Sequence, residues 1–168
     1  MQSNLLVDNI MVENQVAVMD VVPFVEPNVM KRVLLMDCTY KTNRYRFPLF
    51  QIVGVTSTEM MFSVAFAFMD GEKEDNYMWV MDKLKGMMDP DSLPEVVVTD
   101  RELALMNAIA RVFPKATHLL CRWHIEKNVF DKCRRKFDDK TWQEFKHAWC
   151  KIGTHFNYIG LQAEACYS

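Results

Sequence analysis

The spacing of apolar and polar positions changes along the chain, from strand-like patterns before residue 70 to helical spacing after it. The continuous apolar run at residues 33–36 is typical of a strand buried on both faces, and it ends at Asp37. Residues 47–56 and 62–68 predict two further strands. In the last of these, large and small residues alternate, which predicts a helix packed against the small side. Short links between the three strands predict an antiparallel meander.

Helical spacing begins with Tyr77, Met81, Leu84 and Met88. A short β-branched run, residues 95–99, then predicts a strand that ends at Asp100. Beyond it, we predict a helix at 103–113, a fifth strand at 117–121 and helices at 125–137 and 141–152. The last helix opens on Thr141 and Glu144, which match a capping box.

This order of elements predicts an α/β fold with a mixed five-stranded sheet and helices on both faces. We divide the chain into an irregular lead-in at 1–30, a core at 31–137 and the beginning of a helical insertion at 138–168, cut short by the end of the chain. No internal repeat, low-complexity tract or Gly/Ser linker interrupts this organisation.

Composition narrows the class of protein. The formal charge is −2, from 20 basic and 22 acidic side chains, whereas a free-standing DNA-binding module is usually strongly basic. The five cysteines are an odd set without regular spacing, which argues against a secreted disulfide framework. The first residues have the pattern of neither a signal peptide nor a membrane span. The basic run Lys132–Lys136 is explained either as a solvated helix face or as a nuclear import signal.

Two aspartates carry the candidate chemistry. Either one alone could be an ordinary polar residue at the end of a strand. If the strands that precede Asp37 and Asp100 are neighbours, however, the two carboxylates lie within roughly 8 Å of each other, close enough to share one hard cation such as Mg²⁺ or Mn²⁺. Two such ions can activate a nucleophile and stabilise the leaving oxygen of a phosphodiester, but that chemistry needs a third acid.

Three sequence motifs reveal a family resemblance. They are D-x-T-Y-x-T-N from Asp37, T-D-x-x-x-A-x-x-x-A-I from Thr99, and C-x-W-H from Cys121. Together they make residues 33–137 resemble the transposase domain of Mutator-like elements (MULE). The same segment is similar to the plant far-red-impaired-response family of transposase-derived transcription regulators. The resemblance implies a ribonuclease-H-like fold in which Asp37 and Asp100 are the first two acids of a catalytic triad.

The third acid of that family is a glutamate located after a helical insertion. Glu144 and Glu164 are the only glutamates late enough in this chain to take its place. Glu144 is better explained by the capping box, and Glu164 lies near the end of the sequence. We therefore expect the third acid to be missing, so that the chain alone is inactive. The two aspartates make Mg²⁺ or Mn²⁺ the candidate cofactor, and we expect no zinc site within this sequence.

Other polar residues have two explanations each. Cys121 and His124 have the spacing of half a zinc site, and His147 with Cys150 could supply the other half. Packing and hydrogen bonding near the catalytic sheet are the better explanation of the first pair, because the second pair lies inside a predicted helix whereas structural zinc sites usually lie in tight turns. Likewise, Lys41, Arg44 and Arg46 are either phosphate contacts for DNA or the solvated tip of a hairpin. The buried thiol expected at Cys38 and the 13 methionines are assigned to the core.

Two functions from different classes follow from the resemblance. The first is the catalytic domain of a Mutator-like DNA transposase, which cuts and rejoins DNA. The second is a transcription regulator that keeps the fold and binds DNA or partner proteins without catalysis. Both imply a nuclear protein that meets DNA through the full-length protein, with a second copy of the chain as a candidate partner. Neither implies a membrane or a small-molecule substrate.

Overall fold

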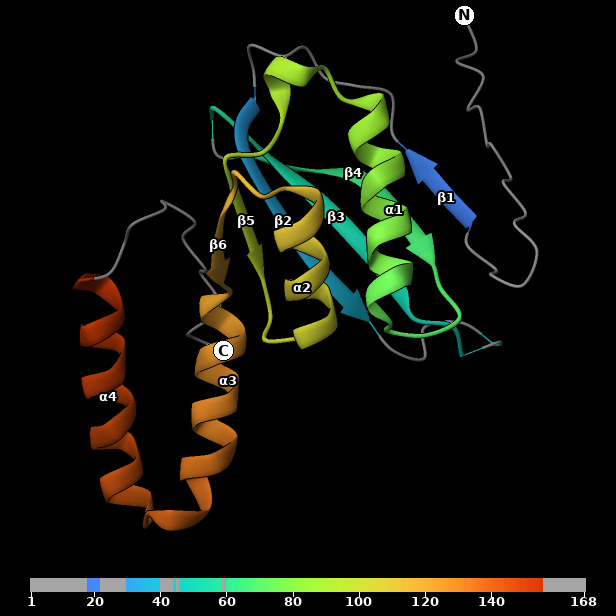
Figure 1. Ribbon diagram of the computed structural model, residues 1–168. Coiled ribbons are helices and arrows are strands. Elements are labelled where there is room, and N and C mark those ends of the chain that lie inside the picture. Colours follow the sequence, from blue (N-terminus) through green and yellow to red (C-terminus); the bar gives the residue numbers. More distant parts are fainter. Residues whose placement is uncertain (1–17, 22–29, 40–43, 45, 59, 156–168) are drawn as a thin grey trace, which may run out of the picture. The chain divides into compact units, whose positions relative to one another are not determined.

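The computed structural model of the chain describes residues 18–21, 30–39, 44, 46–58 and 60–155. The chain divides into two compact units, Met1–Leu120 and Cys121–Ser168. The first contains the sheet and two helices, and the second contains a pair of helices (Figure 1).

The sheet of the first unit has the strand order β1-β4-β3-β2-β5-β6. The antiparallel meander consists of β2 (Met30–Thr39), β3 (Leu49–Thr56) and β4 (Met61–Phe68). On the other side of β2, the strands β5 (Val96–Thr99) and β6 (Thr117–Leu120) are added in parallel. The predicted mixed sheet of five strands is therefore confirmed. Since β2 and β4 both run antiparallel to β3, the carboxyl ends of β2, β4, β5 and β6 lie at one edge of the sheet.

A sixth strand, β1 (Val18–Val21), pairs antiparallel with β4. It lies in the segment 1–30, where we predicted no regular element. Four residues are too few to show a clear period, and the partner strand lies more than 40 residues further along the chain. The remainder of that segment, apart from Met30, lies outside the described residues.

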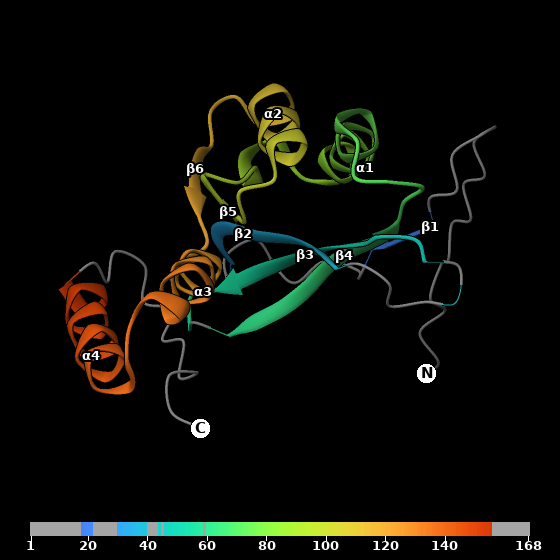
Figure 2. The same cartoon turned by 90° about the horizontal axis from the view of Figure 1, so that it is seen from below.

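Helices α1 (Glu74–Met87) and α2 (Leu103–Val112) cover the same face of the sheet (Figure 2). A short 3-10 helix, η2 (Pro90–Ser92), follows α1. We predicted helices on both faces of the sheet. Within the first unit, α1 and α2 both lie on one face. The remaining α-helices belong to the second unit. The core between helices and sheet contains fully buried side chains from both layers. The largest of these are Tyr77, Phe50, Leu34, Met36 and Ile52.

The predicted alternation holds in the second half of β4, where the small residues lie in the core under the helices, whereas Ser63 in the first half is exposed. Ala65 and Ala67 are fully buried in the core cluster together with Tyr77 and Val80 of α1. The larger Phe66 is only partly buried. A methyl side chain lets the helix approach the sheet closely, because it occupies little of the space between the two layers.

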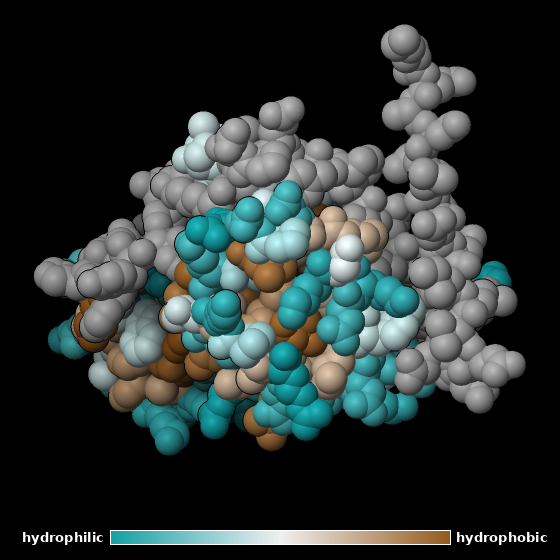
Figure 3. Space-filling model, turned by 45° about the horizontal axis from the view of Figure 1, so that its top comes forward, coloured by the Kyte–Doolittle hydropathy of each residue, from teal (hydrophilic) through white to brown (hydrophobic). Residues whose placement is uncertain are grey.

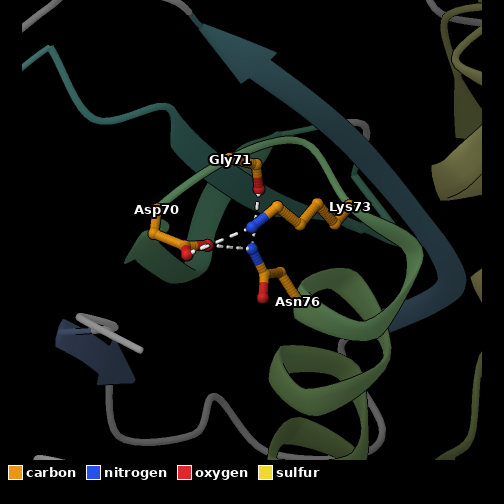
Figure 4. Close-up of polar contacts among 4 residues, drawn as sticks. All are labelled: Asp70, Gly71, Lys73 and Asn76. Carbon is orange, nitrogen blue, oxygen red and sulfur yellow. Dashed lines mark hydrogen bonds and ion pairs between the residues drawn. The ribbon is translucent and has the colours of Figure 1, made fainter. Parts of the chain in front are cut away.

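The connection from β4 to α1 is held by the buried side chain of Asn76 (Figure 4). Its Nδ2 donates to Asp70 Oδ1 at 2.5 Å and to the carbonyl oxygen of Gly71 at 2.9 Å. Lys73 Nζ lies 3.3 Å from Asp70 Oδ2. The hydrogen bond from Asn76 lowers the pKa of Asp70 most, and the contact with Lys73 lowers it further. The turn is therefore stabilised by a charged acceptor and a donor that is shielded from water.

The second unit consists of α3 (Arg122–Cys133), the 3-10 turn η3 (Arg134–Lys136) and α4 (Asp139–His155). Helix α4 begins at Asp139, earlier than the capping box at Thr141 predicted. The actual cap is Asp138, whose carboxylate accepts from the backbone N–H of Thr141 at 2.8 Å. An acidic cap at this end is stabilised by the helix dipole as well as by the hydrogen bond.

An aromatic cluster joins the two helices of this unit. The ring of Phe130 lies 5.2 Å from Trp142 and 6.3 Å from Phe145. Phe145 in turn stacks with Trp142 at 5.7 Å and with Trp149 at 6.2 Å. Trp142, Phe145 and Trp149, which follow one another at helical spacing, thus form an apolar stripe that contacts the preceding helix. Ile152, the next position of that spacing, is 55% exposed.

Hydrophobic residues (brown) show between hydrophilic ones (teal) on the surface in Figure 3. Several apolar side chains are exposed, including Leu103 on α2 and both Leu119 and Leu120 on the edge strand β6. Within the described parts of the chain, no helix combines the length and apolar character that crossing a membrane requires.

Candidate functional site

The two predicted acids come together at the carboxyl ends of adjacent parallel strands. The last aligned pair of β2 and β5 is Met36 with Thr99. Asp37 follows Met36 in β2 and Asp100 follows Thr99 at the end of β5, and neighbouring strands lie about 4.8 Å apart. Both side chains are half-buried. The prediction that these strands are neighbours is confirmed, and residues 63 positions apart in sequence thereby share one place on the sheet edge.

Alternation along β2 directs Asp37 away from the helices. Leu34 and Met36 are buried beneath α1 and α2, and Cys38 packs against the same core. Asp37 lies between them in sequence, so its side chain projects from the opposite face of the sheet. There it pairs in register with Gln51, an exposed residue of β3.

Asp100 occupies a turn that is fixed by hydrogen bonds on both sides. Its Oδ1 accepts from the backbone N–H of Glu102 at 3.3 Å. Glu102 caps α2, because its Oε1 accepts from the N–H of Ala104 at 3.1 Å. On the strand side, the hydroxyl of Thr99 donates to the carbonyl oxygen of Asp100 at 2.6 Å.

A histidine of the neighbouring strand extends this set of contacts. His118 Nε2 lies 2.7 Å from Thr99 Oγ1. Because the single hydroxyl proton of Thr99 is directed at the Asp100 carbonyl, the imidazole must donate from Nε2. Burial lowers the pKa of His118.

The thiol of Cys38 has an unusual environment beside Asp37. Burial raises its pKa to about 12, and the nearby carboxylate of Glu72 adds to the rise. Burial likewise raises the pKa of Tyr77, and the Cys38 thiol and the carboxylates of Glu72 and Glu102 contribute. A thiol so far from ionising is a poor nucleophile, and the assignment of Cys38 to the core agrees with this.

The donor set fits one divalent ion only in part. Two carboxylates at adjacent strand ends are ligands of the type that Mg²⁺ or Mn²⁺ prefers. Across the described residues, however, no group of three or more His, Cys, Asp and Glu side chains is arranged to hold a metal ion. Glu144 is exposed on α4 in the second unit, and Glu164 lies outside the described residues. Among its described residues, the first unit therefore offers two of the carboxylates that a two-metal centre requires.

Cys121 and His124 both belong to the second unit. Cys121 precedes the first turn of α3, and the ring of His124 lies 4.8 Å from that of Trp123 in an edge-to-face contact. His147 and Cys150 lie on α4. The four do not form a metal-holding group among the described residues, so the structure offers no support for the zinc alternative.

The basic candidates for DNA contact follow β2. Arg44 and Arg46 are exposed, and Lys41 lies outside the described residues. Arg46 has a φ of 62°, in the left-handed region that few residues other than glycine adopt.

Several residues around the two acids were missed by the sequence analysis. Thr99 and His118 are 19 residues apart in sequence and contact each other across neighbouring strands, which no local pattern reveals. Glu102 could have been found as a cap, since it comes directly before the apolar spacing of α2. No sequence pattern indicated Glu72, because Cys38, the residue whose pKa it raises, is distant in sequence.

Comparison with known proteins decides the family. The sequence model of the MULE transposase domain matches residues 33–128, more than half of the chain. The chain belongs to the MULE transposase domain family. The matched segment includes both aspartates and ends within α3, so this MULE domain contains the whole sheet except β1 and the beginning of β2.

Curated relatives of this MULE domain include plant and fungal proteins. Protein FAR1-RELATED SEQUENCE 5 of Arabidopsis thaliana is 33% identical over 101 residues, 60% of this chain and 13% of that protein. Protein FAR-RED IMPAIRED RESPONSE 1 of the same plant is 23% identical over 141 residues, 74% of this chain and 17% of that protein. A PKS-NRPS hybrid synthetase (cheA) of Chaetomium globosum is 36% identical over 106 residues, 62% of this chain and 2% of that protein. The chain thus spans less than a fifth of the length of each.

Proposed function

We propose that this MULE domain is the acid-bearing core of a DNA transposase, in which Asp37 and Asp100 bind a divalent cation, Mg²⁺ or Mn²⁺. One observation carries the proposal: the parallel pairing of β2 with β5 brings two aspartates from distant parts of the sequence to the same sheet edge. Two carboxylates held this close repel each other unless a cation lies between them. When bound, such an ion supplies Lewis-acid stabilisation of charge on phosphate oxygens.

The two carboxylates bind the cation, but cutting and joining DNA requires further ligands. In-line displacement at a phosphodiester with two ions needs a third acid. We propose that this ligand comes from a part of the full-length protein beyond the residues described, and that DNA is reached through that protein. A chromosomal DNA substrate implies a nuclear protein.

The cation site is tested by calorimetric titration with Mn²⁺. We expect the wild-type chain to bind weakly and Asp37→Asn or Asp100→Asn to weaken binding by about tenfold, since each removes one ligand charge. Asp82→Asn, which removes an exposed carboxylate on α1, is the matched control and should bind like the wild type. Equal affinity in all four proteins would refute the site.

A regulator without catalysis is the second candidate, and the similarity to proteins named for far-red-impaired response favours it. In this case DNA or a partner protein is bound, and Asp37 and Asp100 are inherited features of the fold. Binding of a labelled duplex, followed by fluorescence polarisation, distinguishes the two functions. Binding that is unaffected by Asp37→Asn and Asp100→Asn, in a full-length protein that does not cleave DNA, would support the regulator.

A further inference from the structure

The turn after β5 is held from inside the core. Thr99 is almost completely buried, with 1% of its surface exposed, yet its side chain is polar. Burying a hydroxyl costs free energy unless its hydrogen bonds are made. Thr99 makes two hydrogen bonds: it donates to the carbonyl oxygen of Asp100 and accepts from His118.

These contacts form one continuous path to the carboxylate of Asp100. His118, on β6, fixes the rotamer of Thr99, and Thr99 fixes the peptide that follows Asp100. The backbone N–H of Glu102 then holds Asp100 Oδ1, and Glu102 is itself fixed as the cap of α2. Backbone and side chain of Asp100 are thereby anchored to β6, to the core and to α2.

We propose that Thr99 and His118 are positioning residues, which hold the turn between β5 and α2 in the conformation that presents Asp100 beside Asp37. The inference rests on the proposed function for the role of Asp100 as a ligand. Groups behind a metal ligand commonly matter in this way, because a ligand held in place loses less freedom when the ion binds.

A purely structural role for these bonds is the competing explanation, and paired substitutions separate the two. Thr99→Val keeps the volume of the side chain and removes the hydroxyl, which leaves the His118 donor without its acceptor. Thr99→Ser keeps the hydroxyl. His118→Leu removes the donor from the other end of the path. Val112→Ala creates a cavity at the far end of α2, where Val112 is buried, and controls for a general loss of stability.

The first measurement is Mn²⁺ affinity, by calorimetry on the whole chain at a temperature where every variant is folded. We expect Thr99→Val and His118→Leu to weaken binding by about tenfold. Thr99→Ser and Val112→Ala should stay close to the wild type. Wild-type affinity in Thr99→Val would overturn the proposal, as would an equal loss in Val112→Ala.

The second measurement needs no metal. Amide hydrogen exchange at Glu102 reports directly on the bond to Asp100 Oδ1. We expect this amide to exchange faster in Thr99→Val and His118→Leu than in Thr99→Ser, relative to amides in the middle of α2. If Asp100→Asn leaves Mn²⁺ binding unchanged, the proposed cation site is wrong, and this exchange experiment alone decides the positioning role. Unchanged exchange in Thr99→Val would refute it.

Discussion

Two polar side chains are buried in the part of the chain that the structure describes, Asn76 and Thr99. Each holds a turn that leads from a strand into a helix, Asn76 after β4 and Thr99 after β5. Both turns lie at the sheet edge that carries Asp37. These two buried side chains therefore lie where the backbone leaves the sheet, and their hydrogen bonds pair groups of the turns.

Asp70 should make the stability of the first unit depend on acid. Its pKa is lowered in the folded protein, so its contribution is complete above the unfolded pKa, near 4, and is lost as the pH falls through the folded value. Asp70→Asn should lower the free energy of unfolding at pH 7, and the difference from the wild type should shrink below about pH 4. Urea unfolding at pH 7, 5 and 3 measures it. Asp82→Asn serves as control, and a difference that persists unchanged at pH 3 would contradict the assignment.

At the scale of elements, the second unit depends on its aromatic cluster. Trp142 is 8% exposed, lies between Phe130 and Phe145, and has Arg134 5.6 Å and Lys146 5.9 Å from its ring. Aromatic packing and cation–π contacts add to the burial of the ring. Among the described residues of the second unit, no other aromatic side chain is buried as deeply, so Trp142 is the aromatic side chain whose loss should cost most stability.

Trp142→Ala should reduce the stability of the helical hairpin by about 3–5 kcal/mol, the usual cost of removing a buried aromatic side chain. Trp123→Ala is the matched control, because Trp123 is 49% exposed and should cost far less. Hydrogen exchange over residues 122–155 measures both effects. Equal protection of the hairpin in the two variants would show that the cluster does not stabilise it.

The sequence predicted the elements better than the contacts between them. Five strands and four helices were found because their apolar periods are long or their runs are bounded by Asp and Pro. The adjacency of Asp37 and Asp100 was predictable too, since a strand–helix–strand unit places parallel strands together. Two of the missed features depend on distant partners: β1 pairs with β4, and His118 bonds to Thr99. The start of α4 was misplaced because Asp138 and Thr141 both suit a helix cap.

At the scale of the whole chain, charge is divided unevenly. Residues 1–120 carry 11 basic and 16 acidic side chains, whereas residues 121–168 carry 9 and 6. The part that holds the proposed cation site is thus acidic, which favours a cation and repels DNA phosphates. Any binding of this chain to DNA should therefore come mainly from the second unit.

We expect the isolated chain neither to cleave DNA nor to join strands in Mg²⁺ or Mn²⁺. Two carboxylates cannot place two ions in line with the attacking and leaving oxygens. A strand-transfer assay on the purified chain is the measurement, with Asp100→Asn as the control. Metal-dependent cleavage that disappears in Asp100→Asn would contradict the expectation and would bring Glu144 or Glu164 back as the third acid.

The pairing of β2 with β5 also has a consequence for how the protein folds. The meander from β2 to β4 joins neighbours in sequence, whereas Met36 meets Thr99 only after a loop of more than 60 residues is closed. Closing such a loop costs entropy and slows the step that depends on it. During synthesis, a chain can therefore build most of its sheet before the two acids meet. A divalent ion would then recognise the finished fold and stabilise it against unfolding by mass action.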